Sequence, residues 1–160
     1  VDGYKAIIER GGEYRKEIIR EFVIASNYAG IAFGNTGVGA IHAMAMVLGG
    51  ACHVPHGKAN YEFLEEVLKE YSRKKPDGKI KELNELLAGA LSCKSQDVYA
   101  SLGDLLGSLI QRKQLRDFGM KYDECETFAD SVIGGQQRLL VNNYAPLTRN
   151  EIADIYKRLY

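Results

Sequence analysis

Apolar side chains recur along this chain at intervals of three and four residues, with charged side chains between them. Residues 18–23 are typical, since Ile18, Ile19, Phe22 and Val23 surround an Arg-Glu pair. This spacing places the apolar side chains on one face of an α-helix, whereas a half-buried strand would show strict alternation, which no segment does convincingly. The pattern therefore predicts an all-α fold in the form of a helical bundle.

Glycine, proline and capping residues indicate where these helices begin and end. The stretch Gly34–Gly37 predicts a turn, in which Asn35 or Thr36 caps a helix that stops at Gly49-Gly50. Further helices are expected near residues 7–8 and 18–23, from Pro55 through Leu68, over residues 80–91, 98–110 and 125–140, and after the capping box Thr148-x-x-Glu151.

Length and charge limit the classes to which this protein can belong. The 160 residues can bury a sizeable core without disulfide or metal cross-links. The 21 basic residues balance 21 acidic ones, which gives no argument for nucleic acid or an anionic membrane as partner. No apolar run approaches the length of about 20 residues that a membrane-spanning helix needs. Three cysteines without a pairing pattern fit a reducing cytoplasm.

The same observations predict a single all-helical domain over residues 1–160. The charged stretch Lys74–Gly78 is the clearest linker in the chain, although it is equally explained as a connection between two helices.

The histidines are the candidate metal-binding residues. His42, His53 and His56 are the only ones in the chain, and they share a glycine-rich segment without any Asp, Glu, Lys or Arg. Imidazole is the commonest neutral metal ligand, so this clustering indicates a metal site. The alternative is that the three serve core packing or helix ends. Small residues such as Gly39 and Ala45 flank His42, which lets another backbone approach closely, and Pro55 restricts the backbone that leads to His56.

The residues around the histidines resemble the iron-dependent (group III) alcohol dehydrogenases. Residues 27–33, Asn-Tyr-Ala-Gly-Ile-Ala-Phe, precede Gly-Val-Gly-Ala-Ile-His-Ala-Met-Ala at 37–45 and Val-Pro-His-Gly-Lys-Ala-Asn at 54–60. In that family a similar His-Ala-Met and a later Pro-His-Gly each supply one metal-ligand histidine. The resemblance implies that His42 and His56 bind Fe²⁺ or Zn²⁺, which acts as a Lewis acid on the substrate oxygen while NAD exchanges the hydride.

Within the family, residues 136–160 and the segment 53–61 look most like the 4-hydroxybutyrate dehydrogenases. The resemblance implies an NAD-dependent enzyme that interconverts 4-hydroxybutyrate and succinate semialdehyde. One alternative is an iron-dependent dehydrogenase for another small alcohol, such as butanol or propanediol. Another is a stand-alone helical metal-binding module without catalysis.

Two sequence features that are typical of the family are absent from these residues. Its members are similar in having an N-terminal dinucleotide-binding half, but here no glycine-rich phosphate loop follows a strand. The family's other two metal ligands form Asp-x-x-x-His, which this sequence lacks. We therefore expect a C-terminal fragment that is inactive alone, with the nucleotide-binding domain upstream of Val1. A homo-oligomer of the full-length protein is compatible with this picture.

Three further residues are candidates for substrate chemistry. His53 either relays the alcohol proton or bonds a backbone carbonyl in a turn. Many relatives carry a second histidine where this chain has Met46, so a relay role does not transfer directly. Arg138 and Lys58 are candidates to bind a substrate carboxylate, and each is otherwise explained as a surface or helix-pairing charge. Cys52 is expected to be a small buried filler rather than a soft metal ligand.

Overall fold

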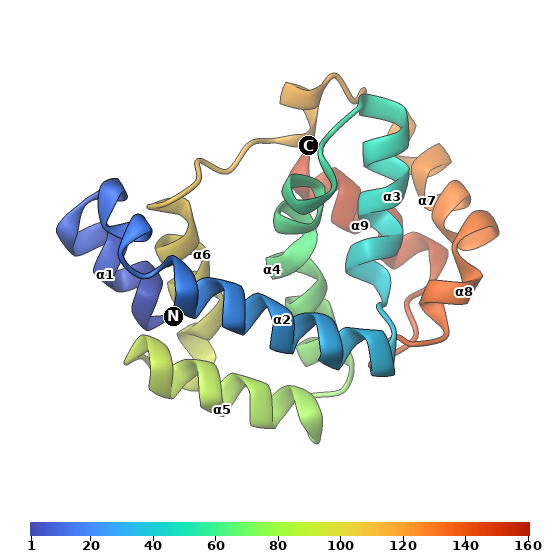
Figure 1. Ribbon diagram of the computed structural model, residues 1–160. Coiled ribbons are helices and arrows are strands. Elements are labelled where there is room, and N and C mark those ends of the chain that lie inside the picture. The colour runs from blue at the N-terminus through green and yellow to red at the C-terminus, as the bar shows by residue number, and fades with distance from the viewer. The chain divides into compact units, whose positions relative to one another are not determined.

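The computed structural model describes residues 1–160 as helices joined by turns, without a strand (Figure 1), so the predicted all-α fold is confirmed. Three short 3₁₀ segments, η1 (Gly12–Lys16), η2 (Ser95–Asp97) and η3 (Leu115–Phe118), lie between the α-helices. The α-helices are α1 (Asp2–Arg10), α2 (Ile19–Thr36), α3 (Ala40–Cys52), α4 (His56–Lys74), α5 (Lys79–Leu91), α6 (Val98–Gly107), α7 (Glu124–Gly135), α8 (Gln137–Leu140) and α9 (Arg149–Leu159).

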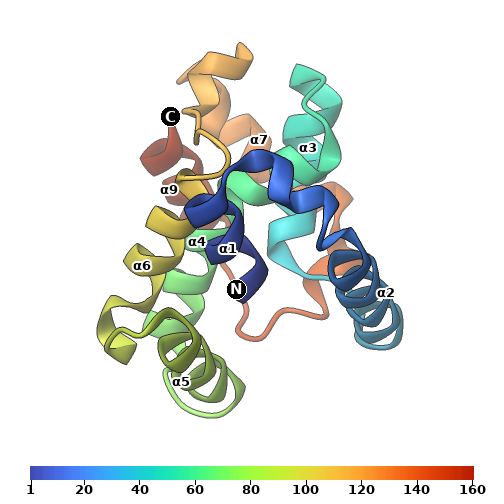
Figure 2. The ribbon, with the colours of Figure 1, turned by 60° about the vertical axis from the view of Figure 1, so that its left-hand side comes forward.

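The chain forms two compact units. The first comprises Val1–Thr36 and Lys81–Gln111, and within it the Lys5 ammonium donates to the Ala90 carbonyl at 2.7 Å. The second comprises Gly37–Ile80 and Arg112–Tyr160, so it contains α3, α4, α7, α8 and α9. Of these, α3, α4, α7 and α9 are labelled in Figure 2. All three histidines belong to the second unit. The single domain expected over residues 1–160 stays a prediction.

The core of the second unit lies where α3, α4, α7 and α9 meet. Tyr156 of α9 is fully buried at its centre, and its ring packs edge-on against Phe63 and Phe128, with centroids 5.2 and 5.7 Å away. Its hydroxyl donates to the Met44 carbonyl of α3 at 3.0 Å, which gives this buried polar group the partner it needs. Other buried members are Ala40, Ala43 and Leu48 of α3, Ala59 and Val67 of α4, Cys125 and Val132 of α7, and Ile152 and Ile155 of α9.

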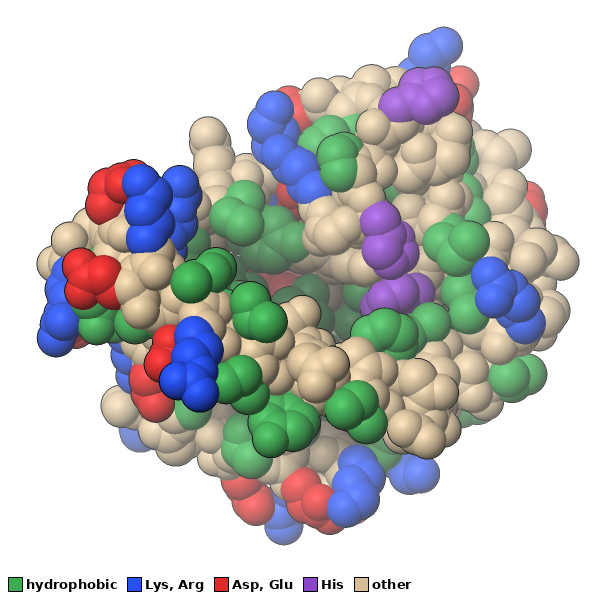
Figure 3. Space-filling view, viewed as in Figure 1, with side chains coloured by type: hydrophobic (Ala, Val, Ile, Leu, Met, Phe, Trp, Pro, Cys, Tyr) green, Lys and Arg blue, Asp and Glu red, His purple; other side chains and the backbone are tan.

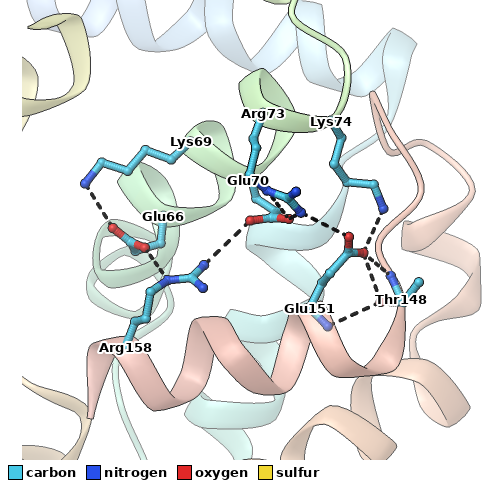
Figure 4. Close-up of polar contacts among 8 residues, drawn as sticks. All are labelled: Glu66, Lys69, Glu70, Arg73, Lys74, Thr148, Glu151 and Arg158. Carbon is cyan, nitrogen blue, oxygen red and sulfur yellow. Dashed lines mark hydrogen bonds and ion pairs between the residues drawn. The ribbon is translucent and has the colours of Figure 1, made fainter. Parts of the chain in front are cut away.

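Ion pairs join α4 to α9 at the surface of this core (Figure 4). Glu66 pairs with Arg158 at 2.7 Å, and Lys74 pairs with Glu151 at 2.7 Å. Glu151 also accepts from the Thr148 backbone N–H at 2.7 Å, while the Thr148 hydroxyl accepts from the Glu151 N–H, so the predicted capping box is confirmed. Exposed pairs contribute little singly, but this network constrains the angle at which α9 lies on α4.

Two predicted helix boundaries are wrong. The helix expected to stop at Gly49-Gly50 continues to Cys52 and ends where His53 adopts a left-handed conformation with φ of 55°. A Cβ at Gly49 would lie 3.0 Å from the Val54 carbonyl, so this glycine makes room for the returning chain instead of ending the helix. The helix expected over residues 125–140 is interrupted at Gln136, which separates α7 from α8.

The predicted cap of α3 is also wrong. Asn35 and Thr36 lie in the last turn of α2, where their side chains donate to the Ile31 and Ala32 carbonyls at 2.7 and 3.1 Å. Ser, Thr and Asn side chains bond the backbone of either neighbouring turn, and here both bond to carbonyls of the preceding turn. α3 instead begins at Ala40, behind Gly37–Gly39.

Residues 75–78 connect α4 to α5, and the boundary between the two units follows at Ile80, so this charged stretch agrees with both predicted explanations. The Tyr144 hydroxyl donates to the Asp77 carbonyl and fixes this connection to the segment before α9.

No single helix is long and apolar enough to cross a membrane. The helices α2 and α3 meet the criteria of length and hydropathy only when they are taken together across the break between them.

Glu62 of α4 is the most unusual buried group. Its side chain is fully buried, and Oε2 has no hydrogen-bond partner. Burial raises the pKa of this carboxyl above its ordinary value of 4.5, and a backbone bond from Lys113 and the nearby Arg112 guanidinium oppose the rise. Because the folded chain keeps the proton to higher pH than the unfolded chain does, this contribution to stability is full below pH 4.5 and is lost as the pH rises through the folded pKa.

Glu62→Gln should remove this pH dependence, because the amide has a similar shape and does not titrate. We expect the free energy of unfolding of the variant, measured in urea, to increase relative to that of the native chain as the pH rises above 4.5, and to level off above the folded pKa of Glu62. Glu85→Gln, at an exposed position of α5, is the matched control and should show no such trend. A constant difference between Glu62→Gln and the native chain would contradict the prediction.

Candidate metal site

His42 and His56 lie next to each other although they come from different helices. Their ring centroids are 5.2 Å apart, and the ring planes meet at 55°. His42 is in the first turn of α3, and His56 is the first residue of α4. Figure 3 shows two of the three histidine side chains in contact and the third apart from them on the same face.

A tight reversal of the chain brings the two histidines together. His53 ends α3 in the left-handed conformation, Val54 is buried, and Pro55 precedes α4 with φ of −55°. A non-glycine residue in the left-handed region is uncommon, so the surrounding contacts hold this turn in place. The proline restricts the backbone just before His56, as predicted, and the connection has only these three residues.

The electrostatics favour metal binding by His42. Burial, followed by the nearby His56 ring, lowers the pKa of His42 below its ordinary value of 6.5. The imidazole is therefore neutral at physiological pH, which is the form that offers a nitrogen lone pair to a metal.

Asn60 holds the ring of His56. Its amide nitrogen lies 3.0 Å from His56 Nε2, one helical turn along α4. When the amide donates, Nε2 carries the lone pair and the ring proton lies on Nδ1. The Asn60 Oδ1 atom is buried and has no hydrogen-bond partner. The spacing of four residues on one helix could have identified this pair from the sequence.

The spacing of the two rings fits a shared metal ion. Two imidazoles bound at about 2.1 Å to one tetrahedral ion have ring centroids about 5 Å apart, close to the observed 5.2 Å. The chain contains no group of three or more His, Cys, Asp or Glu side chains able to hold a metal ion. His42 and His56 thus fit as part of a ligand set, and a catalytic set needs further donors.

The other predicted site residues lie elsewhere in the second unit. His53 is exposed at the end of α3. The Lys58 ammonium lies over the Phe118 ring, 5.4 Å from its centroid. Its charge opposes part of the rise that burial causes in the pKa of the Glu62 carboxyl. Arg138 is exposed on α8. Cys52 is half-buried, and burial raises the pKa of its thiol.

A hollow of about 290 Å³ lies beside His42. It is lined by the first residues of α3 together with Tyr71, Asn142 and Tyr144. No local pattern predicts that these three residues lie beside α3, because they are far from it along the chain. Apolar side chains such as Val38 and Ile41 form much of the lining, so the hollow suits a short aliphatic molecule.

Comparisons with known proteins show which family the chain resembles. The C-terminal model of the Fe-containing alcohol dehydrogenase family matches residues 1–160. The chain is 59% identical over its whole length to the 4-hydroxybutyrate dehydrogenase of Clostridium kluyveri and covers 43% of that protein. It is 31% identical to the long-chain-alcohol dehydrogenase 1 of Geobacillus thermodenitrificans, over 84% of this chain and 35% of that protein.

The fold also resembles that of a solved structure. The crystal structure of a 1,3-propanediol oxidoreductase matches 82% of this chain and 35% of its own with a TM-score of 0.71 and 27% sequence identity. The chain thus spans less than half the length of the proteins it resembles.

Asn60→Asp should convert the histidine pair into a site with three donors. A carboxylate oxygen would take the place of the amide nitrogen 3.0 Å from His56 Nε2, and two donors at about 2.1 Å on one tetrahedral ion lie about 3.4 Å apart, so a small shift of the side chain would let both bind. We expect calorimetry to show Zn²⁺ binding at least about tenfold tighter than in the native chain. Asn60→Ala is the control and should bind no tighter. Equal affinities of the Asp and Ala variants would refute this placement of Nε2.

Proposed function

The chain belongs to the Fe-containing alcohol dehydrogenase family, and we propose that the protein is a metal-dependent, NAD-linked 4-hydroxybutyrate dehydrogenase. It would interconvert 4-hydroxybutyrate and succinate semialdehyde. The observation that carries this proposal is the 59% identity to a 4-hydroxybutyrate dehydrogenase along the whole chain, together with the His42–His56 pair that the structure brings together. This activity would require a nucleotide-binding part, and these 160 residues contain no glycine-rich phosphate loop after a strand.

His42 and His56 are the proposed ligands of Fe²⁺ or Zn²⁺. When bound, the metal would polarise the substrate oxygen and so favour hydride exchange with the nicotinamide. The remaining ligands would come from outside residues 1–160, because the chain offers no third donor beside the pair. The neutral state of His42 prepares this imidazole for the role. The Asn60 amide holds the ring of His56 in orientation and would release the Nε2 lone pair when a metal binds there.

The remaining proposed roles concern the substrate. The apolar hollow beside His42 would hold the methylene chain and exclude water from it. Arg138 is a better candidate than Lys58 for the carboxylate, because Lys58 already lies over Phe118 while the Arg138 guanidinium is exposed. His53 remains a candidate proton relay. Its exposure would let it exchange protons with the solvent.

We further propose that the enzyme is cytoplasmic, since three free thiols suit a reducing compartment. Its small-molecule partner would be an alcohol or aldehyde, and association into homo-oligomers is compatible with the exposed apolar side chains of α2, such as Val23 and Tyr28.

A second candidate function is a dehydrogenase for an uncharged small alcohol. It is favoured by the likeness to a 1,3-propanediol oxidoreductase and by the apolar lining of the hollow, which provides no cation for a carboxylate. A non-catalytic metal-binding module is a weaker alternative, because the resemblance to dehydrogenases covers the whole chain.

In the full protein, His42→Ala and His56→Ala should each lower kcat/KM for 4-hydroxybutyrate by several orders of magnitude, because each loses a metal ligand. His53→Ala is the matched control and should cost about 10²-fold or less. Metal content, measured by elemental analysis, should fall only in the first two variants. Full metal content in His42→Ala or His56→Ala would exclude that residue as a ligand.

The substrate can be tested separately. Specificity constants for 4-hydroxybutyrate, 1-butanol and 1,2-propanediol should favour 4-hydroxybutyrate, and Arg138→Ala should raise KM for this substrate alone, because an interaction made equally in the ground and transition states is lost. A clear preference for an uncharged alcohol would replace the first function by the second and leave the metal site intact.

A further inference from the structure

Asn143 contacts both helices that carry the histidine pair. It lies in the connection between α8 and α9, and its Oδ1 atom accepts two hydrogen bonds. The Ala40 backbone N–H of α3 donates the first at 2.7 Å. The Tyr71 hydroxyl of α4 donates the second at 2.8 Å. One side-chain oxygen therefore joins the beginning of α3 to the last turns of α4.

The bond to Ala40 replaces a missing helix cap. The first N–H groups of a helix have no partner inside it, and a side-chain oxygen at the N-cap position usually accepts from them. The N-cap residue of α3 is Gly39, which has no side chain. Asn143 supplies the acceptor instead, from 103 residues away in sequence. His42 belongs to the turn that this bond holds, together with the bond from the Ala43 N–H to the Gly39 carbonyl at 3.1 Å.

The surroundings of Asn143 Oδ1 are tightly packed. A Cβ atom on Gly39 would lie 2.6 Å from Oδ1 and 3.4 Å from the Tyr71 hydroxyl, so only glycine leaves room for the two bonds. Ala40 is fully buried, and Tyr71 is 7% exposed. Burial raises the pKa of Tyr71 to about 12, and its hydroxyl therefore stays a donor throughout the physiological range. A half-buried acceptor with two buried donors has few alternative arrangements.

We propose that Asn143 is a positioning residue for the histidine pair. By accepting one bond from each helix it fixes the start of α3 against α4, and so sets the separation of His42 and His56. Asn143 acts through Ala40 and Tyr71 and has no contact with the substrate in this role. The consequence for metal binding rests on the proposed function, whereas the connection between the two helices does not.

The experiment compares four variants of the full protein. Asn143→Ala removes the acceptor, and Asn143→Asp retains an oxygen at the same place. Thr148→Ala is the matched control, because it removes a similar cap from α9 without touching α3. We expect Asn143→Ala to speed hydrogen exchange of the Ala40 and Ala43 amides about tenfold, while Thr148→Ala speeds exchange only in α9. Asn143→Asp should exchange at close to the native rate.

Co²⁺ titration, followed by its d–d absorption, tests the effect on the pair. Asn143→Ala should bind Co²⁺ about tenfold more weakly and with an altered spectrum, while Thr148→Ala binds within about twofold of the native protein. Tyr71→Phe is a milder variant that retains the bond to Ala40, and it should weaken Co²⁺ binding without exposing the Ala40 amide. Asn143→Asp should restore both the affinity and the spectrum.

Native Co²⁺ affinity and spectrum in both Asn143→Ala and Tyr71→Phe would overturn the positioning role, as would equal losses in Asn143→Ala and Thr148→Ala. If the native protein takes up no Co²⁺, the proposed metal function fails. The hydrogen exchange of the Ala40 and Ala43 amides then decides by itself whether Asn143 holds α3 in place, and an unchanged rate in Asn143→Ala would overturn that.

Discussion

The close packing of α3 on α4 is the constraint on which the rest of the second unit depends. Small side chains, Ala40 and Ala43 on α3 and Ala59 on α4, are fully buried in the shared core and let the backbones approach. That approach places Tyr156 within reach of Met44, and it allows His42 of one helix to meet His56 of the other. A larger side chain at any of these alanines would separate the helices and, with them, the two imidazoles.

The sequence predicted what depends on local pattern and missed what depends on distant partners. The all-α fold, the capping box at Thr148 and the return of the chain at Pro55 follow from neighbouring residues, and they were predicted correctly. Gly49 was misinterpreted, because its small size serves a contact with the Val54 carbonyl and not the end of the helix. Glycine has several structural uses, and the local sequence does not distinguish them.

The candidate site also combines features that the local sequence predicts with features that depend on distant residues. His42 and His56 were identified from their neighbours in sequence, and the structure brings their rings together. Asn60 lies one turn from His56 and was within reach of helical spacing. Tyr71 and Asn143 were not, because 72 residues separate them and neither pattern nor composition links such positions. The buried Glu62 was equally invisible, since a glutamate among other charges on a helix reads as exposed.

The order in which the chain is made gives these distant contacts a further meaning. Asn143 and Tyr156 bond to α3 across 103 and 112 residues, so α3 is synthesised long before the groups that hold it. Until then its first turn has no cap and the Met44 carbonyl lacks the Tyr156 hydroxyl. A chain growing from its N-terminus therefore completes the contacts that hold α3 only after α9 has been synthesised.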